Sequence, residues 1–102
     1  MPVTEQRKKE IKDCADEAIS SIKKSTELSF NDDEHHKSGR SGNHGKKFNR
    51  IAVAIIHCKN NPRCLADHGC FTNEEEKRLV IQEFEKRSKA YHNKAKAINH
   101  KQ

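Results

Sequence analysis

The sequence predicts an all-α fold, a small three-helix bundle with a long flexible loop between the first and second helices. Two long segments carry apolar residues three and four positions apart, which is the spacing of one face of an α-helix. The longest apolar run, residues 51–56, has no second candidate strand with which it could pair in a sheet. With 102 residues, of which 31% are apolar and 35% charged, the chain has room for a single domain with a thin core.

The first helix is predicted over residues 4–28, a segment without Pro or Gly. Ile11, Ala15, Ala18 and Ile22 recur at spacings of four, three and four, which places them on one face. Thr4 precedes the pattern and suits the N-cap position, where its hydroxyl can accept from a free backbone N–H group.

The connection over residues 29–45 is predicted to be a mobile loop. It has no hydrophobic periodicity and contains Gly, Ser, Asn and charged residues throughout. Connections of this length in small domains tend to be either functional or disordered. Both interpretations stay open from the sequence.

The second helix is predicted over residues 46–60 and is expected to be the most buried of the three. A buried strand is the competing interpretation of its apolar run. Asn61 and Pro62 end it, because the residue before proline is disfavoured in the α region. Its apolar residues at helical spacing are Phe48, Ile51, Ala52, Ile55 and Ile56.

A cysteine-bearing connection over residues 61–71 precedes the third helix, predicted over residues 72–99. Thr72 and Glu75 match a capping box, in which two side chains bond each other's free backbone N–H groups. The seam of this helix is predicted to be Ile81, Phe84, Ser88, Tyr91, Ala95 and Ile98.

Four cysteines allow three interpretations. Cys58, Cys64, His68 and Cys70 carry the thiolate and imidazole ligands that zinc prefers, but with five residues between successive cysteines the spacing is wider than in most structural sites. A disulfide between Cys64 and Cys70 would instead close a short loop and leave Cys14 free to pair with Cys58. The third interpretation is four reduced thiols that pack as small hydrophobic side chains.

We expect no catalytic residue and no cofactor other than the zinc alternative. His57 and Cys58 are adjacent on a helix, so their side chains diverge by roughly 100° and cannot form a local nucleophile and base pair. The glycines between Gly39 and Gly45 follow no strand, and Lys46 is followed by Lys47 rather than by Ser or Thr. They therefore do not match a phosphate-binding loop.

The positive charge makes an anionic partner plausible. Lys and Arg number 21 against 15 Asp and Glu, for a net charge of +6, although Lys-rich helical faces are also ordinary solvated surfaces. Phosphate contact needs only a positive field, whereas reading bases needs side chains fitted to a groove. The candidate binding surface is Arg40, Lys46, Lys47, Arg87, Lys89, Lys94 and Lys96.

The sequence predicts no membrane span, because the longest apolar run is far shorter than the roughly 20 residues that cross a bilayer. The first ten residues are polar and do not resemble a signal peptide. As it stands the chain is expected in the cytoplasm, or in the periplasm or outside the cell if a signal has been removed and the cysteines are paired.

One family resemblance is carried by the order of features along the chain. Two helices are followed by Lys59-Asn60-Asn61-Pro62, then by Cys64 and Cys70 with five residues between them, and last by an amphipathic helix. This order resembles the periplasmic antiholin domain of T-even phages over about half of the chain. The resemblance implies a Cys64–Cys70 disulfide and a helical domain that inhibits lysis by binding the periplasmic domain of a holin.

The function expected from the sequence is that of a small non-enzymatic regulatory or inhibitory protein that binds another protein. The contact would be made by a helical face or by the loop over residues 29–45. Nucleic-acid binding by the basic residues is the alternative. The apolar seams are narrow enough that a second copy of the chain could complete them, which adds a homodimer to the expected assemblies.

Overall fold

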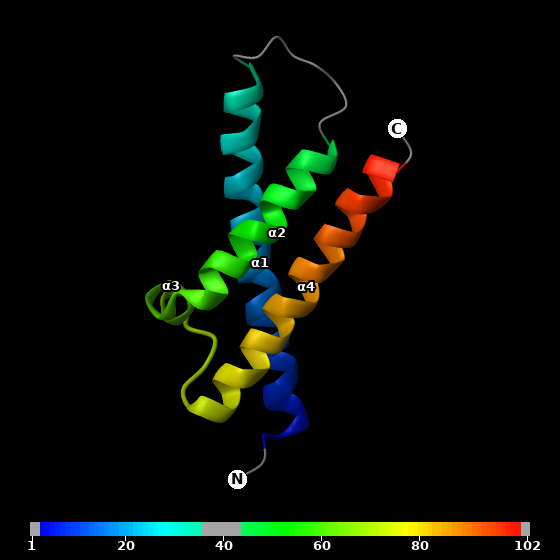
Figure 1. Ribbon diagram of the computed structural model, residues 1–102. Coiled ribbons are helices and arrows are strands. Elements are labelled where there is room, and N and C mark those ends of the chain that lie inside the picture. Colours follow the sequence, from blue (N-terminus) through cyan, green and yellow to red (C-terminus); the bar gives the residue numbers. More distant parts are fainter. Residues whose placement is uncertain (1–2, 36–43, 101–102) are drawn as a thin grey trace.

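The computed structural model describes residues 3–35 and 44–100, with side chains for residues 3–30 and 45–98. Within these residues the chain forms four helices and no strand, which confirms the all-α fold (Figure 1). The bounds are α1 Glu5–His35, α2 His44–Asn60, α3 Pro62–Asp67 and α4 Glu74–His100.

The three long helices pack on one another, and α3 packs on α2. In Figure 1, α2 runs opposite to both α1 and α4, and it crosses in front of α1. The core lies along the lines where the three long helices meet, and aliphatic side chains fill most of it. Its largest fully buried side chains are Ile11, Ile19, Ile51, Ile55, Leu65, Val80 and Phe84.

Helix α1 begins as the sequence predicts and ends later. The Oγ1 atom of Thr4 accepts from the backbone N–H of Arg7 at 3.1 Å, so Thr4 is the N-cap. The helix then continues to His35, seven residues into the segment predicted as a loop. Within this extension the Phe30 ring is buried, and the Arg50 guanidinium lies 5.2 Å from the ring centroid. Residues 36–43 of the predicted loop lie outside the described residues.

The connection after α2 contains a helix that the sequence did not predict. The Asn61 side chain accepts from the backbone N–H groups of Arg63 at 3.0 Å and Cys64 at 3.2 Å, and Pro62 occupies the first helical turn. Asparagine at the N-cap and proline just inside the helix are both preferred choices. The segment predicted as a plain loop is therefore half helical, with Leu65 buried beneath it.

Helix α4 begins at Glu74, and the predicted capping box is wrong by one residue. Asn73 Oδ1 accepts from the backbone N–H of Glu76 at 2.9 Å, so Asn73 is the cap. Thr72 donates from its backbone N–H and its hydroxyl to the Glu76 carboxylate, both at 2.9 Å. Asparagine caps at least as well as threonine, and Glu76 rather than Glu75 faces the interior.

The predicted seam of α4 is largely confirmed. Phe84, Ser88, Tyr91 and Ala95 are buried. Val80 is fully buried where Ile81 was expected, and both Ile81 and Ile98 are half-buried. A helix offers neighbouring positions to the same groove, so only the packing of α1 and α2 selects between Val80 and Ile81.

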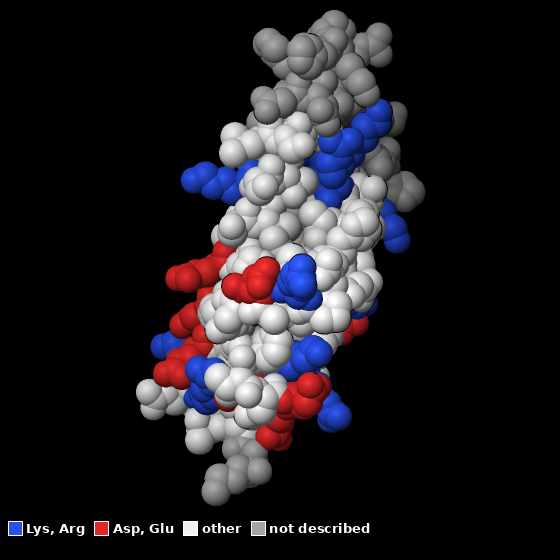
Figure 2. Space-filling view, turned by 90° about the vertical axis from the view of Figure 1, so that its left-hand side faces the viewer, with Lys and Arg blue, Asp and Glu red and all other residues white. Residues whose placement is uncertain are grey.

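On one face of the molecule, the charged side chains that the structure describes are unevenly distributed. Figure 2 looks at the side on which α3 lies in Figure 1. Among the coloured side chains of its upper half, only Lys and Arg appear as charged groups, whereas the lower half carries both signs.

In the part of the chain that the structure describes, no helix is both long and apolar enough to cross a membrane.

Candidate functional site

The four cysteines form two disulfides, Cys14–Cys70 and Cys58–Cys64. The predicted pairing of Cys64 with Cys70 is therefore wrong, as is that of Cys14 with Cys58. The reason is the short helix α3, which turns the Cys64 side chain back onto the last turn of α2. Cys70 lies beyond α3, beside α1, and so meets Cys14.

His68 lies between the two disulfides. It is the C-cap of α3, and Gly69 follows it with a φ of 66°, a left-handed conformation that glycine adopts without steric cost. This turn places the His68 carbonyl oxygen 3.8 Å from Cys14 Sγ and 3.7 Å from Cys70 Sγ. A disulfide sulfur has no proton to donate, so these are packing contacts rather than hydrogen bonds.

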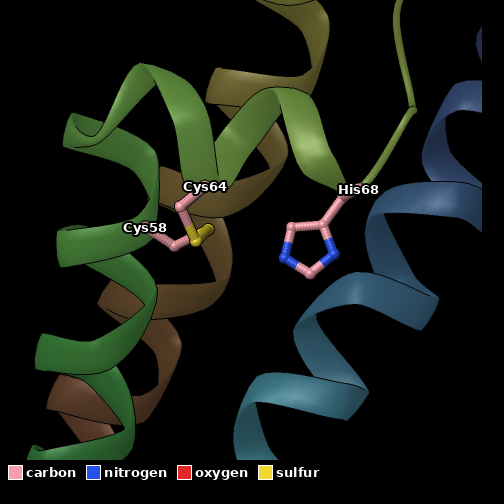
Figure 3. A group of neighbouring side chains, drawn as sticks. All are labelled: Cys58, Cys64 and His68. Atoms are coloured by element: carbon pink, nitrogen blue, oxygen red, sulfur yellow. A yellow bond between two sulfur atoms is a disulfide. The ribbon is translucent and has the colours of Figure 1, made fainter.

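The His68 imidazole faces the other disulfide. The sulfurs of Cys58 and Cys64 and a ring nitrogen of His68 all lie within 4.8 Å of one another (Figure 3). Cys58 is buried, whereas Cys64 and His68 are half-buried. Three of the four residues considered as zinc ligands are thus brought together. Cys70 is not part of this group because Cys14 holds it on the other side of the His68 backbone.

A groove of about 500 Å³ runs between α1 and α2 and ends at this disulfide. Its lining combines hydroxyls and small apolar groups with the disulfide itself. None of the lining residues is Lys, Arg, Asp or Glu, in a chain that is 35% charged. The lining residues are Ser21, Ile22, Ser25, Thr26, Ala54, His57, Cys58, Asn61 and Cys64.

Two exposed apolar residues lie beyond the groove, one on each helix. Leu28 is three residues after Ser25, and Val53 is four residues before His57, so each extends the same helical face by one turn. Their exposed fractions are 61% and 37%, and they are the exposed large hydrophobic residues of the described chain. We call the groove lining together with Leu28 and Val53 the α1–α2 face.

A second groove, of about 330 Å³, lies between the first turns of α1 and the first half of α4. It is lined mainly by charged side chains, among them Lys8, Lys9, Lys12 and Glu83. Long charged side chains of this kind are the usual solvated surface of a helix pair.

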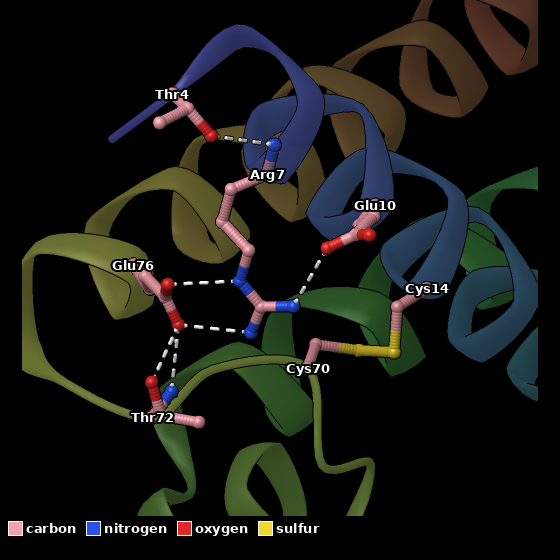
Figure 4. A network of polar contacts seen from close by, with 7 residues as sticks. All are labelled: Thr4, Arg7, Glu10, Cys14, Cys70, Thr72 and Glu76. Carbon is pink, nitrogen blue, oxygen red and sulfur yellow. Dashed lines mark hydrogen bonds and ion pairs between the residues drawn. A yellow bond between two sulfur atoms is a disulfide. The ribbon is translucent and has the colours of Figure 1, made fainter.

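An ion-pair network fastens the first turn of α1 to the first turn of α4 (Figure 4). Arg7 donates to Glu76 from Nε at 2.8 Å and from Nη2 at 3.0 Å. With the two bonds from Thr72, the carboxylate accepts four hydrogen bonds. These bonds, first of all those from Arg7, lower the pKa of Glu76 from 4.5 to about 2. The same pair raises the pKa of Arg7.

The predicted basic surface is divided rather than continuous. Arg87 Nη1 lies 2.9 Å from Asp16 Oδ1, and Lys47 Nζ lies 3.4 Å from Glu27 Oε2. These two cations therefore tie α4 and α2 to α1. Arg40 lies outside the described residues.

The other predicted cations reach solvent. Lys94 Nζ lies 5.6 Å from the Phe48 ring centroid and 5.4 Å from that of Tyr91, a cation–π contact at the edge of the α2–α4 interface. Lys46, Lys89 and Lys96 are exposed.

Comparisons with protein-family models, with curated proteins and with solved structures find no match to this chain.

Two features of the site were missed by sequence reasoning. Cys64 and His68 are four residues apart, which is one helical turn, but this spacing has meaning only once α3 is recognised. The Asn-Pro pair at Asn61 and Pro62 was the available signal, since it is typical of a helix start as well as of a helix end. The α1–α2 face has no local sequence signature because it combines residues from two helices.

Proposed function

We propose that this chain is a non-enzymatic regulatory or inhibitory protein that acts by binding another protein, and that the α1–α2 face is its contact surface. The observation that carries the proposal is the absence of charged side chains among the nine residues that line the groove. The centres of protein–protein interfaces are depleted in charged residues in the same way. Exposed apolar side chains at the rim, Leu28 and Val53, add area that a partner can bury.

The disulfides support the same function. Cys58–Cys64 forms one end of the groove, and Cys14–Cys70 joins α1 to the segment that precedes α4. Both constraints hold α1, α2 and α3 in one arrangement before a partner arrives. A preorganised surface loses less conformational entropy on binding, which increases affinity.

Site-specific photo-crosslinking tests the proposal. A photo-reactive side chain is placed at Ser25 or at Ala54 in the groove, and at Lys89, an exposed position on α4, as the control. In extract from the source cells, we expect the two groove positions to capture the same protein and Lys89 not to capture it. Adding Thr26→Arg, which places a charge in the groove, should abolish the capture.

The proposal fails if the two groove positions capture nothing, or if Lys89 captures the same protein with equal yield. Circular dichroism of each variant checks that the helices remain intact. Loss of capture in a variant with an unchanged spectrum then reports on the surface and not on folding.

Nucleic-acid binding is the second candidate function, and the charge distribution favours it. Lys and Arg are the only charged groups among the coloured side chains in the upper half of Figure 2. Lys46 and Lys96 are exposed, at the start of α2 and near the end of α4, while Arg87 is engaged with Asp16. Phosphate binding would weaken steeply with salt because counterions are released. Negligible affinity for a random duplex at low salt would exclude this function.

The resemblance to periplasmic antiholins gives the protein-binding proposal one specific partner class, the periplasmic domain of a holin. The disulfide that the resemblance implies, Cys64–Cys70, is not the one found, because Cys64 pairs with Cys58. A direct binding measurement with such a domain would test the partner class. Binding that Thr26→Arg abolishes would place the contact on the α1–α2 face.

A further inference from the structure

We propose that the Cys58–Cys64 disulfide is the oxidised state of a zinc site, and that its reduction creates a three-ligand Zn²⁺ site from Cys58, Cys64 and His68. The disulfide and the metal would be alternative occupants of the same sulfurs. The three donor atoms already lie within 4.8 Å of one another in the oxidised chain (Figure 3).

The ligand types and their placement fit zinc. Thiolate and imidazole are its preferred ligands, with Zn–S bonds of about 2.3 Å and Zn–N bonds of about 2.0 Å. Tetrahedral coordination at those lengths requires sulfurs roughly 3.8 Å apart and a similar sulfur–nitrogen distance. Once the disulfide opens, side-chain rotations at three residues can reach these distances from the present cluster.

Two elements hold the ligands. Cys64 lies within α3 and His68 is its C-cap, one turn later, and the turn at Gly69 fixes the end of that helix. Cys58 comes from the last turn of α2, on which α3 packs. The fourth coordination position is left to water or to an external donor. Because Cys58 and Cys64 also line the groove, that position is within reach of solvent.

The remaining cysteines are placed elsewhere. Cys14 and Cys70 contact the carbonyl oxygen of His68, and this backbone group separates them from the imidazole side of the residue. They are not members of the donor cluster found among the described residues. The proposal therefore assigns zinc to one cysteine pair and predicts that the other pair does not bind it.

The redox step balances with a phosphine reductant such as TCEP. The Sγ–Sγ bond accepts two electrons from phosphorus, and the phosphine takes an oxygen atom from water to become a phosphine oxide. The two hydrogens of that water protonate the two sulfurs. Zn²⁺ then displaces both thiol protons to solvent, so binding should weaken as the pH falls.

The first experiment uses the full chain and zinc itself. Two samples of the oxidised protein receive Zn²⁺, and one of them is then reduced with TCEP. The metal bound to each is measured after desalting. We expect one zinc per reduced chain and none per oxidised chain. Relative to the reduced chain without zinc, zinc should lower the alkylation of Cys58 and Cys64 in peptide maps and leave that of Cys14 and Cys70 unchanged, a comparison that removes the effect of burial. Equal protection of all four cysteines, or no bound zinc, would overturn the proposal.

The second experiment assigns the ligands. Co²⁺ in place of zinc reports thiolate coordination through its charge-transfer absorption. His68→Gln should weaken binding by about 100-fold or more, since loss of even an outer-shell partner costs 10–100-fold. His57→Gln is the matched control, because this histidine neighbours Cys58 but is absent from the cluster. An equal loss in both variants, or no loss in His68→Gln, would contradict the assignment.

Folding of the reduced chain is followed by circular dichroism in the same samples. If reduction alone lowers the helical signal, zinc should restore it in the native sequence, because binding energy at such a site is also folding energy. It should not restore it in Cys58→Ser. If zinc restored the helical signal in Cys58→Ser as well as in the native sequence, the metal would be bound elsewhere and the proposal would be refuted.

Discussion

At the scale of single residues, Glu76 accepts more hydrogen bonds than any other described carboxylate. Its exposed fraction is 7%, and burial alone would raise the pKa of a carboxyl group. The bidentate contact from Arg7 and the two bonds from Thr72 outweigh that effect, so the pKa falls to about 2. The ion pair and the Cys14–Cys70 disulfide (Figure 4) are two separate links, from α1 to α4 and from α1 to the segment just before α4.

This pKa predicts how stability depends on pH. Because the pKa of Glu76 is lower in the folded chain, folding favours its ionised form. Its contribution to the free energy of unfolding is complete above pH 4.5 and is lost as the pH falls toward about 2. Chemical denaturation across this range should show a smaller acid-induced loss in Glu76→Gln than in the native chain. Glu75→Gln, which changes an exposed neighbour, should keep the native slope. Parallel curves for the native chain and Glu76→Gln would contradict the expected role.

At the scale of elements, side-chain caps fix where the helices begin. Thr4, Asn61 and Asn73 each accept from backbone N–H groups that the following helix leaves free. Gly69 ends α3 by adopting a positive φ, and its backbone N–H donates to the Ala66 carbonyl at 2.9 Å. The bonds at Asn61 and Gly69 mark the two ends of α3, and this helix places Cys64 and His68 one turn apart in space.

Replacing the cap of α4 should destabilise the fold by a small, defined amount. Asn73→Ala leaves the Glu76 N–H without its side-chain acceptor and should lower the free energy of unfolding by about 1 kcal/mol. Asn93→Ala is the control, since Asn93 is exposed within α4 and alanine favours helix there. Urea denaturation of both variants measures the difference. A loss in Asn93→Ala as large as that in Asn73→Ala would argue against the assigned cap.

The end of α3 gives a second prediction at this scale. Gly69→Ala places a Cβ on a residue with a φ of 66°, where nothing lies within 4 Å of the added atom. The expected cost is therefore one of backbone conformation alone, about 1 kcal/mol. Gly69→Asn should cost less, because asparagine tolerates the left-handed region. In thermal unfolding, Gly69→Asn should have a higher melting temperature than Gly69→Ala. The opposite order would contradict this explanation.

At the scale of the whole molecule, the disulfides compensate for a thin core. Only 31% of the residues are apolar, and a core of this size leaves a small margin of stability. Cys14–Cys70 links residues 56 apart in the sequence, whereas Cys58–Cys64 links residues 6 apart. In the chain-entropy model a longer closed loop restricts the unfolded chain more.

The two disulfides should therefore contribute unequally to stability. Removing the 56-residue link with Cys14→Ser and Cys70→Ser should cost about 4 kcal/mol, and removing the 6-residue link with Cys58→Ser and Cys64→Ser about 2 kcal/mol. Denaturant unfolding without reductant compares the two double variants. In reductant, the native sequence loses both disulfides. Its free energy of unfolding should then fall by about the sum of the two losses. Equal losses would show that loop length does not set the contribution.

The sequence by itself determined which face of each long helix is buried. Ile11, Ala15 and Ala18 on α1 and Phe84 and Tyr91 on α4 were predicted to face the core, and they do. The Thr4 cap was predicted as well. Such features depend on residues three or four positions apart, and helical geometry relates those residues without any knowledge of the rest of the fold.

Only the tertiary structure decided how distant residues pair. How the helices pack on one another decides the partners of Cys14 and Cys58. It also decides that Glu76 rather than Glu75 points inward and that Phe30 is buried. Helix packing also decides the α1–α2 face and the cluster of Cys58, Cys64 and His68. Periodicity along one helix states which side is apolar, but it contains no information on which residue of another helix will lie opposite.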